Sequence, residues 1–418
     1  MHRNLLFNQD SVQRLLSAGS ASIGRMLGAS AALSMVEIAA SQAGPVLVLA
    51  TDPRHADQLE AEIRWFAGDE LPVRHLVEWE TLPYDTFSPH QDIVSQRLRV
   101  LGALPGVEAG IVIVSSPSLL QRLPPVDYVS ARTIQIRQGQ TLDRQHFIDS
   151  LAGSGYLRVP QVDEHGEYAV RGSLLDIYPM GSDRPLRIDF FDDEVESLRY
   201  FDAETQISDR KLDSVDILPA REMPLDDEGI RTFRHRYRER FEGRPSGSRV
   251  YREVSDGIAH GGIEYYLPLF FEQTAHLGDY LPADTLIFAP VDLDGILKQA
   301  WSEVEERYEM CRHDTERPIL GPAESFFACS AVADRLSDFR QIGYSGQSLR
   351  EGEAALNLPV RLSPAVRIEA RYEDAARALM SFLDEFDGRV LFTADSPGQR
   401  ESVLDLSLIH ISEPTRLC

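Results

Sequence analysis

The first residues that could do chemistry lie in a glycine-containing loop, SIGRMLGASAALS, ahead of the first long apolar run of the chain. A phosphate-binding loop needs GxxxxGK[ST], because successive backbone N–H groups wrap the phosphates while the lysine and the hydroxyl meet the terminal phosphate and magnesium. Here Gly28 is followed by Ala29, no lysine lies nearby, and Arg25 precedes the glycine. We therefore predict a degenerate P-loop at Gly28 that binds no cofactor and only turns into a helix; a working ATP site is the alternative.

Other polar clusters lack the spacing of a catalytic or metal site. His165 has acidic neighbours but no second histidine at helical spacing, so we favour a solvated or hydrogen-bonded histidine over a metal ligand. Cys311 and His313 lie in a charged helical stretch without a nucleophile signature. The acidic pairs 192–193 and 226–227 stand in turn-like contexts, where turn chemistry explains them. We predict no catalytic residue and no metal site.

A predicted β-hairpin offers a different kind of chemistry, that of protein recognition. Residues 186–191 and 195–201 flank two aspartates that are typical of a turn. The period of two places Ile188 and Phe190 on an apolar, core-facing side and leaves Arg187 and Phe191 outside. An exposed aromatic ring beside an arginine is typical of an interface, and Arg171 could lie on the neighbouring strand. From the residues alone, an ordinary surface cation pair beside an exposed ring remains the favoured alternative.

Composition excludes several classes of protein. The chain has 418 residues, of which 43% are hydrophobic, and its three cysteines lack metal or disulfide spacing, which fits the cytoplasm. No stretch is long and apolar enough to cross a membrane. The net charge of −24 disfavours binding of the whole chain to nucleic acid. The arginine-rich stretch 231–244 is the one candidate basic footprint, and we favour a solvated helix face there.

The elements that must position these residues follow from hydrophobic periodicity. Residues 44–63 predict a buried strand that leads into a helix, and residues 110–114 predict a second strand followed by another apolar helical stretch. Short alternating strands and one helix follow from residue 133, and a third apolar strand appears at 285–293. Residues 377–400 predict a further helix-then-strand unit. The fold class is therefore α/β, with a doubly wound domain interrupted by a small α+β domain.

The domain boundaries predicted from these patterns separate five segments. We expect residues 1–131 and 219–345 to form the two halves of the first α/β domain, and residues 132–218 to form the inserted, hairpin-rich domain. Residues 346–406 would begin a further small α/β domain, truncated here. The last segment, 407–418, resembles translated sequencing-adapter sequence and is expected to be a non-native tail.

Three sequence blocks resemble the family of transcription-repair coupling factors. These blocks are residues 79–101, 165–208 and 262–272, in the family's order and spacing, and the resemblance extends to about Leu406. It implies a region similar to the excision-repair helicase UvrB, with the degenerate P-loop domain interrupted by a domain that binds the damage-recognition protein UvrA. The positions that match the family's interface are Arg171, Arg187 and Phe191.

The resemblance also implies what lies beyond this chain. The family's ATP-driven DNA translocase, with its ATP and magnesium, and its contacts to RNA polymerase and double-stranded DNA belong to domains further along. We therefore expect this chain to be a UvrA-recruiting module without enzymatic activity; a UvrB-like helicase fragment with an active ATPase is the alternative. Where UvrB carries a DNA-clamping hairpin, this chain retains Tyr84 and Phe87, which we expect to be packing residues.

Overall fold

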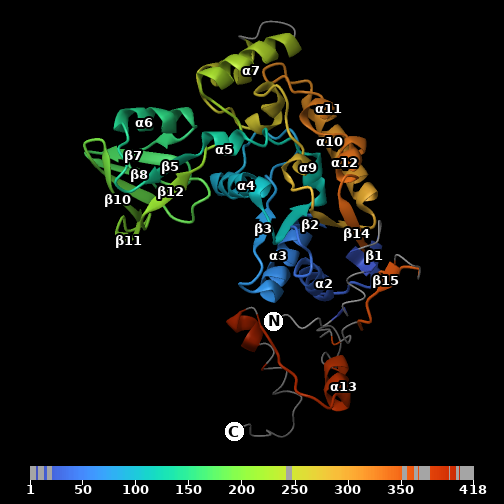
Figure 1. Cartoon of the computed structure of the whole chain (residues 1–418). Coiled ribbons are helices and arrows are strands. Elements are labelled where there is room, and N and C mark those ends of the chain that lie inside the picture. The colour runs from blue at the N-terminus through green and yellow to red at the C-terminus, as the bar shows by residue number, and fades with distance from the viewer. Residues whose placement is uncertain are drawn as a thin grey trace. The chain divides into compact units, whose positions relative to one another are not determined.

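The computed structural model describes most of the chain in two compact units, 1–359 and 360–418 (Figure 1). The described residues are 6–7, 14–16, 21–241, 247–350, 355–361, 366, 377–394, 396–401 and 404. The predicted tail at 407–418 lies outside them. Among the described residues, no helix is long and apolar enough to span a membrane.

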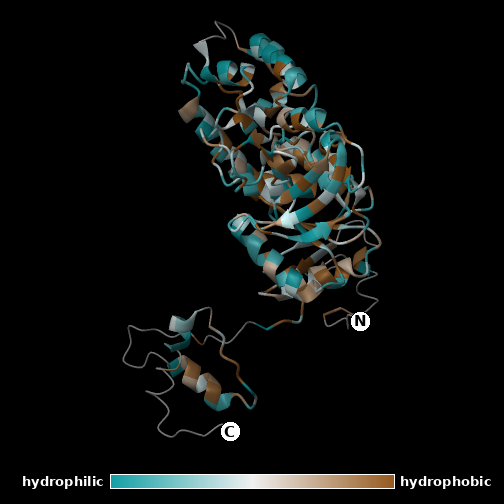
Figure 2. Cartoon of the chain, turned by 90° about the vertical axis from the view of Figure 1, so that its left-hand side faces the viewer, coloured by the Kyte–Doolittle hydropathy of each residue, from teal (hydrophilic) through white to brown (hydrophobic). Residues whose placement is uncertain are grey.

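A seven-stranded parallel sheet forms the centre of the first unit. Its strands, in spatial order, are β15 (Ala355–Asn357), β1 (Ala21–Gly24), β14 (Arg340–Tyr344), β13 (Leu286–Pro290), β2 (Val46–Ala50), β4 (Ile111–Ser115) and β3 (Val73–Leu76). Every residue of β2, β4 and β13 is buried, because a parallel strand covered on both faces must be apolar throughout. In Figure 2 hydrophobic residues gather towards the middle of this unit, and hydrophilic residues are frequent on its outer helices. The three predicted apolar strands are thus confirmed as neighbours in one sheet.

Helices and short 3-10 segments connect the first strands. They are α2 (Ser30–Ala39), α3 (Pro53–Ala67), α4 (Gln91–Ala103), η1 (Leu104–Gly106), η2 (Ser116–Leu120) and α5 (Tyr128–Arg132). Helix α3 begins at Pro53 because the Asp52 side chain accepts a hydrogen bond from the His55 N–H, and proline at the first helical position lacks only an N–H that the helix does not need. The helix is capped by Gly68, which has a φ of 57°, a value that glycine adopts without strain. This confirms the strand-then-helix unit predicted at 44–63.

An inserted segment between α5 and residue 218 forms two further sheets. It contains β5 (Ile134–Arg137), α6 (Arg144–Gly153), β6 (Leu157–Arg158), β7 (Glu167–Arg171), β8 (Leu174–Ile177), β9 (Leu186–Phe191), β10 (Glu194–Phe201), β11 (Ser208–Leu212) and β12 (Ser214–Ile217). Strands β11-β10-β9-β8-β7-β6 make a six-stranded sheet, antiparallel except for β6 with β7, while β12 pairs with β5. Phe147 of α6 packs against Phe190, so α6 covers one face of this sheet (Figure 1).

The chain then returns to the first sheet through a group of helices. These are α7 (Asp227–Arg240), α8 (Arg249–Ser255), η4 (Ile263–Leu269), α9 (Leu277–Tyr280), α10 (Leu293–Cys311), α11 (Pro322–Ser325) and α12 (Cys329–Leu336). Strand β13 pairs with β2 in parallel, so the expected return to the first sheet after the insertion is observed. Helix α7 lies at the top of the unit in Figure 1.

The structure differs from the sequence predictions at three elements. The apolar stretch after β4 is only the five-residue η2, because Gln121 and Leu123 leave it to form β-bridges with Phe326 and Ala275. The first sheet continues beyond residue 345, since β15 pairs with β1. In the second unit α13 (Arg377–Glu385) forms as expected, but the described residues 386–394 that follow it form no strand, so the strand expected there is not observed.

Candidate functional site

The β9–β10 hairpin has the orientation that its period of two predicts. Phe191 pairs with Glu194 across a turn at Asp192, whose φ of 54° is typical of a tight hairpin turn. Ile188 is fully buried, whereas the Phe191 side chain is 69% exposed. A large aromatic ring therefore stands in solvent at the end of a rigid hairpin, where a protein partner could cover it.

Arg187 lies on the same face as Phe191 but is not a free surface cation. Its Nε and Nη2 donate to the two carboxylate oxygens of Asp176 at 2.6 and 2.9 Å, and its Nη1 donates to the Gln206 carbonyl and the Ser208 hydroxyl, each at 3.2 Å. The guanidinium also lies 4.7 Å from the ring centre of Phe201. Hydrogen bonding to Asp176 raises the pKa of Arg187, so the guanidinium remains charged. The expected exposed cation is instead a half-buried group that ties β9 to β8.

Arg171 lies on this face too, one strand further away than predicted. Strand β8 separates β7 from β9, and the register aligns Arg171 with Leu174 and Leu174 with Asp189. Directly opposed residues share a face of the sheet, so Arg171, Arg187 and Phe191 all face the same side. Two strand spacings place Arg171 about 10 Å from β9. The Arg171 side chain is exposed and donates to the Pro160 carbonyl at 3.0 Å.

The loop at Gly28 borders a hollow of about 670 Å³ at the carboxyl ends of four parallel strands. Met26, Thr51, Val291 and Ser345 line it just beyond β1, β2, β13 and β14. This edge is where α/β sheets bind ligands.

The charges that line this hollow do not suit phosphate. The lining includes Glu62 and Asp292 and, among the described residues, no lysine or arginine. Burial lowers the pKa of His55, and its Nδ1 accepts the Thr51 N–H at 3.2 Å, so its imidazole is neutral. The hollow therefore offers two acidic groups and no cation to an anionic ligand.

The two aromatic residues of the 84–87 segment behave differently. Tyr84 is fully buried and packs against the rings of Tyr265, Tyr308 and Phe326, as predicted. Phe87 is 72% exposed, so its prediction as a packing residue is wrong. The reason is that the backbone of this loop, rather than the Phe87 ring, lies against the Gly261 backbone.

His165 is hydrogen-bonded, as expected from the sequence, and the sequence analysis missed one polar cluster. His165 bonds to Asp92 Oδ1 at 2.6 Å and to the Ser182 carbonyl at 2.8 Å. In the cluster that sequence reasoning missed, His75 Nδ1 on β3 lies 2.8 Å from Glu60 Oε2 and 3.9 Å from Asp57 Oδ1, both on α3. The three-residue spacing of Asp57 and Glu60 was a signal, but the pairing of α3 with β3 was needed to bring His75 to them.

Comparisons with known proteins identify two regions of the chain. A family model described as the UvrB interaction domain matches residues 134–223, which include the hairpin, and one described as the D3 domain of MFD matches residues 382–412. The second match extends into the segment that we expected to be a non-native tail.

Full-length relatives are similar over most of the chain. The transcription-repair-coupling factor of Escherichia coli (strain K12) is 38% identical over 385 residues, which is 92% of this chain and 33% of that protein. The corresponding factor of Haemophilus influenzae is 38% identical over 388 residues, with the same shares, and that of Myxococcus xanthus is 31% identical over 332 residues. The chain thus spans about a third of the length of the first two relatives.

Proposed function

We propose, since this chain belongs to the transcription-repair-coupling factor family, that it recruits the excision-repair protein UvrA through the β9–β10 face of its inserted domain. The observation that carries this proposal is the exposed ring of Phe191 within the region that matches the UvrB interaction domain. A rigid, exposed aromatic group is a typical hot-spot residue at protein interfaces.

The three site residues would contribute in different ways. Phe191 would be the apolar anchor, and the exposed Arg171 would supply a cation on the same face. Most of the Arg187 N–H groups already donate hydrogen bonds to Asp176, Gln206 and Ser208. We therefore assign Arg187 a positioning role, in which it holds β9 in place.

We further propose that the α/β domain is a helicase-like domain whose P-loop has degenerated at Gly28, and that this chain hydrolyses no ATP. In the whole protein, ATP with magnesium, double-stranded DNA and RNA polymerase would be engaged by domains beyond this chain, in the cytoplasm. The acidic lining of the hollow supports this proposal, because Glu62 and Asp292 would repel triphosphate.

An active ATPase of the UvrB kind is the second candidate, since the hollow lies where such sheets bind nucleotides. ATP hydrolysis by the purified chain, measured with and without DNA, separates the two. Turnover clearly above background would establish the ATPase and overturn the proposal of a degenerate loop.

Recruitment of UvrA is tested by measuring its affinity for the chain and for two phenylalanine variants. Phe191→Ala should weaken binding about 30-fold, equivalent to about 2 kcal/mol. Phe87→Ala is the matched control, because it removes an equally exposed ring outside the hairpin and should leave the affinity unchanged. Equal affinities for the chain and Phe191→Ala would refute the assignment of the face.

A further inference from the structure

Helix α7 carries four arginines that have no carboxylate partner among the described residues. These are Arg231, Arg234, Arg236 and Arg238, and the first, second and fourth are exposed. Elsewhere arginines form ion pairs, such as Arg99 with Asp183 at 2.5 Å. In a chain with a net charge of −24, neighbouring acids could readily neutralise such a row. The unpaired cations therefore form a local positive surface on an acidic molecule.

The helical period arranges these arginines around two hollows. Arg231, Arg234 and Arg238 share one exposed side of α7, beside the side that carries the buried residues Phe233 and Tyr237. They border a hollow of about 430 Å³ together with His235 and Glu239, whose side chains lie 3.2 Å apart, so three arginines face one carboxylate there.

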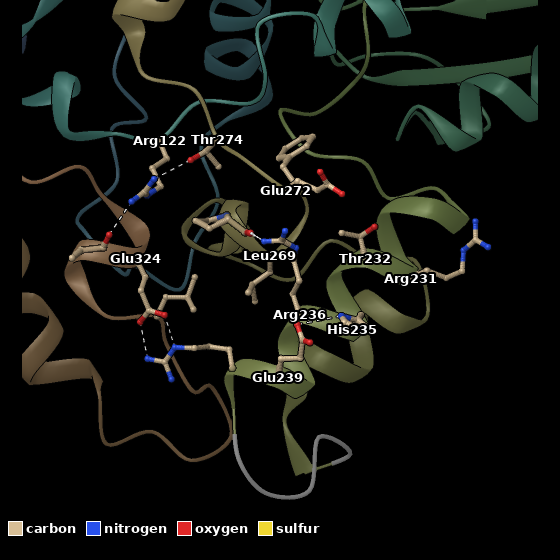
Figure 3. Close-up of a pocket in the computed structure, with 15 residues that line it drawn as sticks. Arg122, Arg231, Thr232, His235, Arg236, Glu239, Leu269, Glu272, Thr274 and Glu324 are labelled. Carbon is tan, nitrogen blue, oxygen red and sulfur yellow. Dashed lines mark hydrogen bonds and ion pairs between the residues drawn. The ribbon is translucent and has the colours of Figure 1, made fainter. Parts of the chain in front are cut away.

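The second hollow, of about 1000 Å³, lies between α7, η4 and α11 (Figure 3). Arg231 and Arg236 line it, together with Arg122, whose Nη1 donates to the Thr274 hydroxyl at 3.0 Å. The lining also contains three acids, Glu239, Glu272 and Glu324. The Glu324 carboxylate is held by Arg240, and that of Glu239 lies 3.2 Å from His235 Nδ1. The α7 arginines thus remain available to an anion from outside.

The spacing of the outer arginines matches a phosphate backbone. Arg231 and Arg238 are seven residues apart, a rise of about 10 Å along the helix. One strand of a double helix carries a phosphate about every 3.4 Å along its axis, so three arginines can face about three phosphates. Binding of single strands needs exposed aromatic platforms, whereas the Phe233 and Tyr237 rings of α7 are buried.

We infer that the outer face of α7 is a contact for the sugar–phosphate backbone of double-stranded DNA, independent of base sequence. This contact would be additional to the UvrA-binding face and to the DNA contacts of domains beyond this chain. The choice of DNA among polyanions rests on the proposed role in repair. This inference is compatible with the solvated helix face predicted for residues 231–244. The arginines that water solvates in the free protein are also accessible to phosphate.

The test is the salt dependence of binding to a short fluorescent duplex, measured by anisotropy with the chain itself. Three phosphate contacts predict a slope of log affinity against log salt of about −2.7, so the affinity should be about 40-fold lower at roughly 200 mM than at 50 mM salt. Replacing Arg231, Arg234 and Arg238 by glutamine should abolish most of this slope. Replacing the same residues by lysine should preserve it, because lysine also neutralises phosphate.

A matched control removes three positive charges from exposed arginines that lie outside α7. Arg54, Arg137 and Arg210 are exposed on other elements, and their joint replacement by glutamine should leave the slope unchanged. The lysine variant also guards against misfolding, because Arg234 donates to the Tyr251 hydroxyl at 3.3 Å and Arg238 lies over the Tyr251 ring.

The inference would be overturned if the unaltered chain did not bind the duplex, or if the glutamine variant kept the same salt slope. It would also be overturned if the chain bound a single strand more tightly than the duplex. The fourth such result would be displacement of the labelled duplex by a poly-glutamate peptide at a lower concentration than by unlabelled duplex. Because UvrA is absent from this experiment, each of these results leaves UvrA recruitment untouched.

Discussion

Replacing Arg187 by alanine should destabilise the inserted domain, although this residue faces away from the main core. The reason is its partner Asp176, whose side chain is only 2% exposed, while that of Arg187 is 18% exposed. Without the guanidinium, a carboxylate stays buried without its counter-charge, or must bind a proton.

The magnitude follows from the burial of this pair. Removing one partner of a buried ion pair typically costs about 3–5 kcal/mol, and the partial exposure of Arg187 places the expected loss near the lower end, at about 3 kcal/mol. Since each 1.4 kcal/mol is a tenfold change, local opening should become about two orders of magnitude more frequent.

Hydrogen exchange of the β9–β10 amides, followed by mass spectrometry, measures this opening within the inserted domain. Arg210→Ala is the control, because Arg210 is exposed on β11 and its loss should change exchange by about twofold or less. Arg187→Met combined with Asp176→Leu should restore protection, because both buried charges are then removed. Protection that survives in Arg187→Ala alone would refute a stabilising ion pair and return Arg187 to a purely surface role.

The remaining predictions concern the hairpin, the loop and one buried acid. Phe191→Ala should change the free energy of unfolding by less than about 0.5 kcal/mol because its ring is exposed, whereas Ile188→Ala should lower it by about 2–5 kcal/mol because it leaves a cavity. Hydrogen exchange measures both changes. A larger loss for Phe191→Ala than for Ile188→Ala would mean that β9 faces the other way. Millimolar magnesium-ATP should not shift the melting temperature, and a rise of several degrees would reveal a working site near Gly28. Burial raises the pKa of Glu264 from 4.5 to about 7, so between these pH values the folded protein keeps a proton that the unfolded chain releases. The contribution of Glu264 to the free energy of unfolding is therefore greatest below about pH 4.5 and is lost as the pH rises to about 7. Glu264→Gln should therefore raise the stability by about 3 kcal/mol near pH 8 and leave it unchanged near pH 4, as comparison of melting curves at the two pH values would show; equal effects at both would contradict the raised pKa.

Elements with strong local patterns could be predicted from the sequence. The buried strands β2, β4 and β13 are continuous apolar runs, and the alternation in β9 correctly places Ile188 inside and Phe191 outside. In such segments burial alone determines the pattern, so a single sequence carries the information.

Features that depend on pairing between distant residues could not be predicted in the same way. The bond between Arg187 and Asp176 exists because β8 and β9 adopt one register, which places these residues opposite each other. Strand β15 has only three residues and forms through its pairing with β1 rather than through its own propensity. The exposure of Phe87 likewise depends on where Gly261 lies against its loop.

The interleaved strand order of the seven-stranded sheet sets a sequence of events during synthesis. Strand β1 is synthesised more than 300 residues before its partners β14 and β15, which end at residues 344 and 357. The six-stranded sheet is continuous from residue 157 to 212, so the insertion can close while the surrounding sheet still lacks three of its seven strands. The β2 edge stays open until β13 has been made, and β1 stays unpaired until β14 has been made at residue 344. A nascent chain stalled before that point would present the folded hairpin sheet, with the face that we propose for UvrA binding, on an unfinished scaffold.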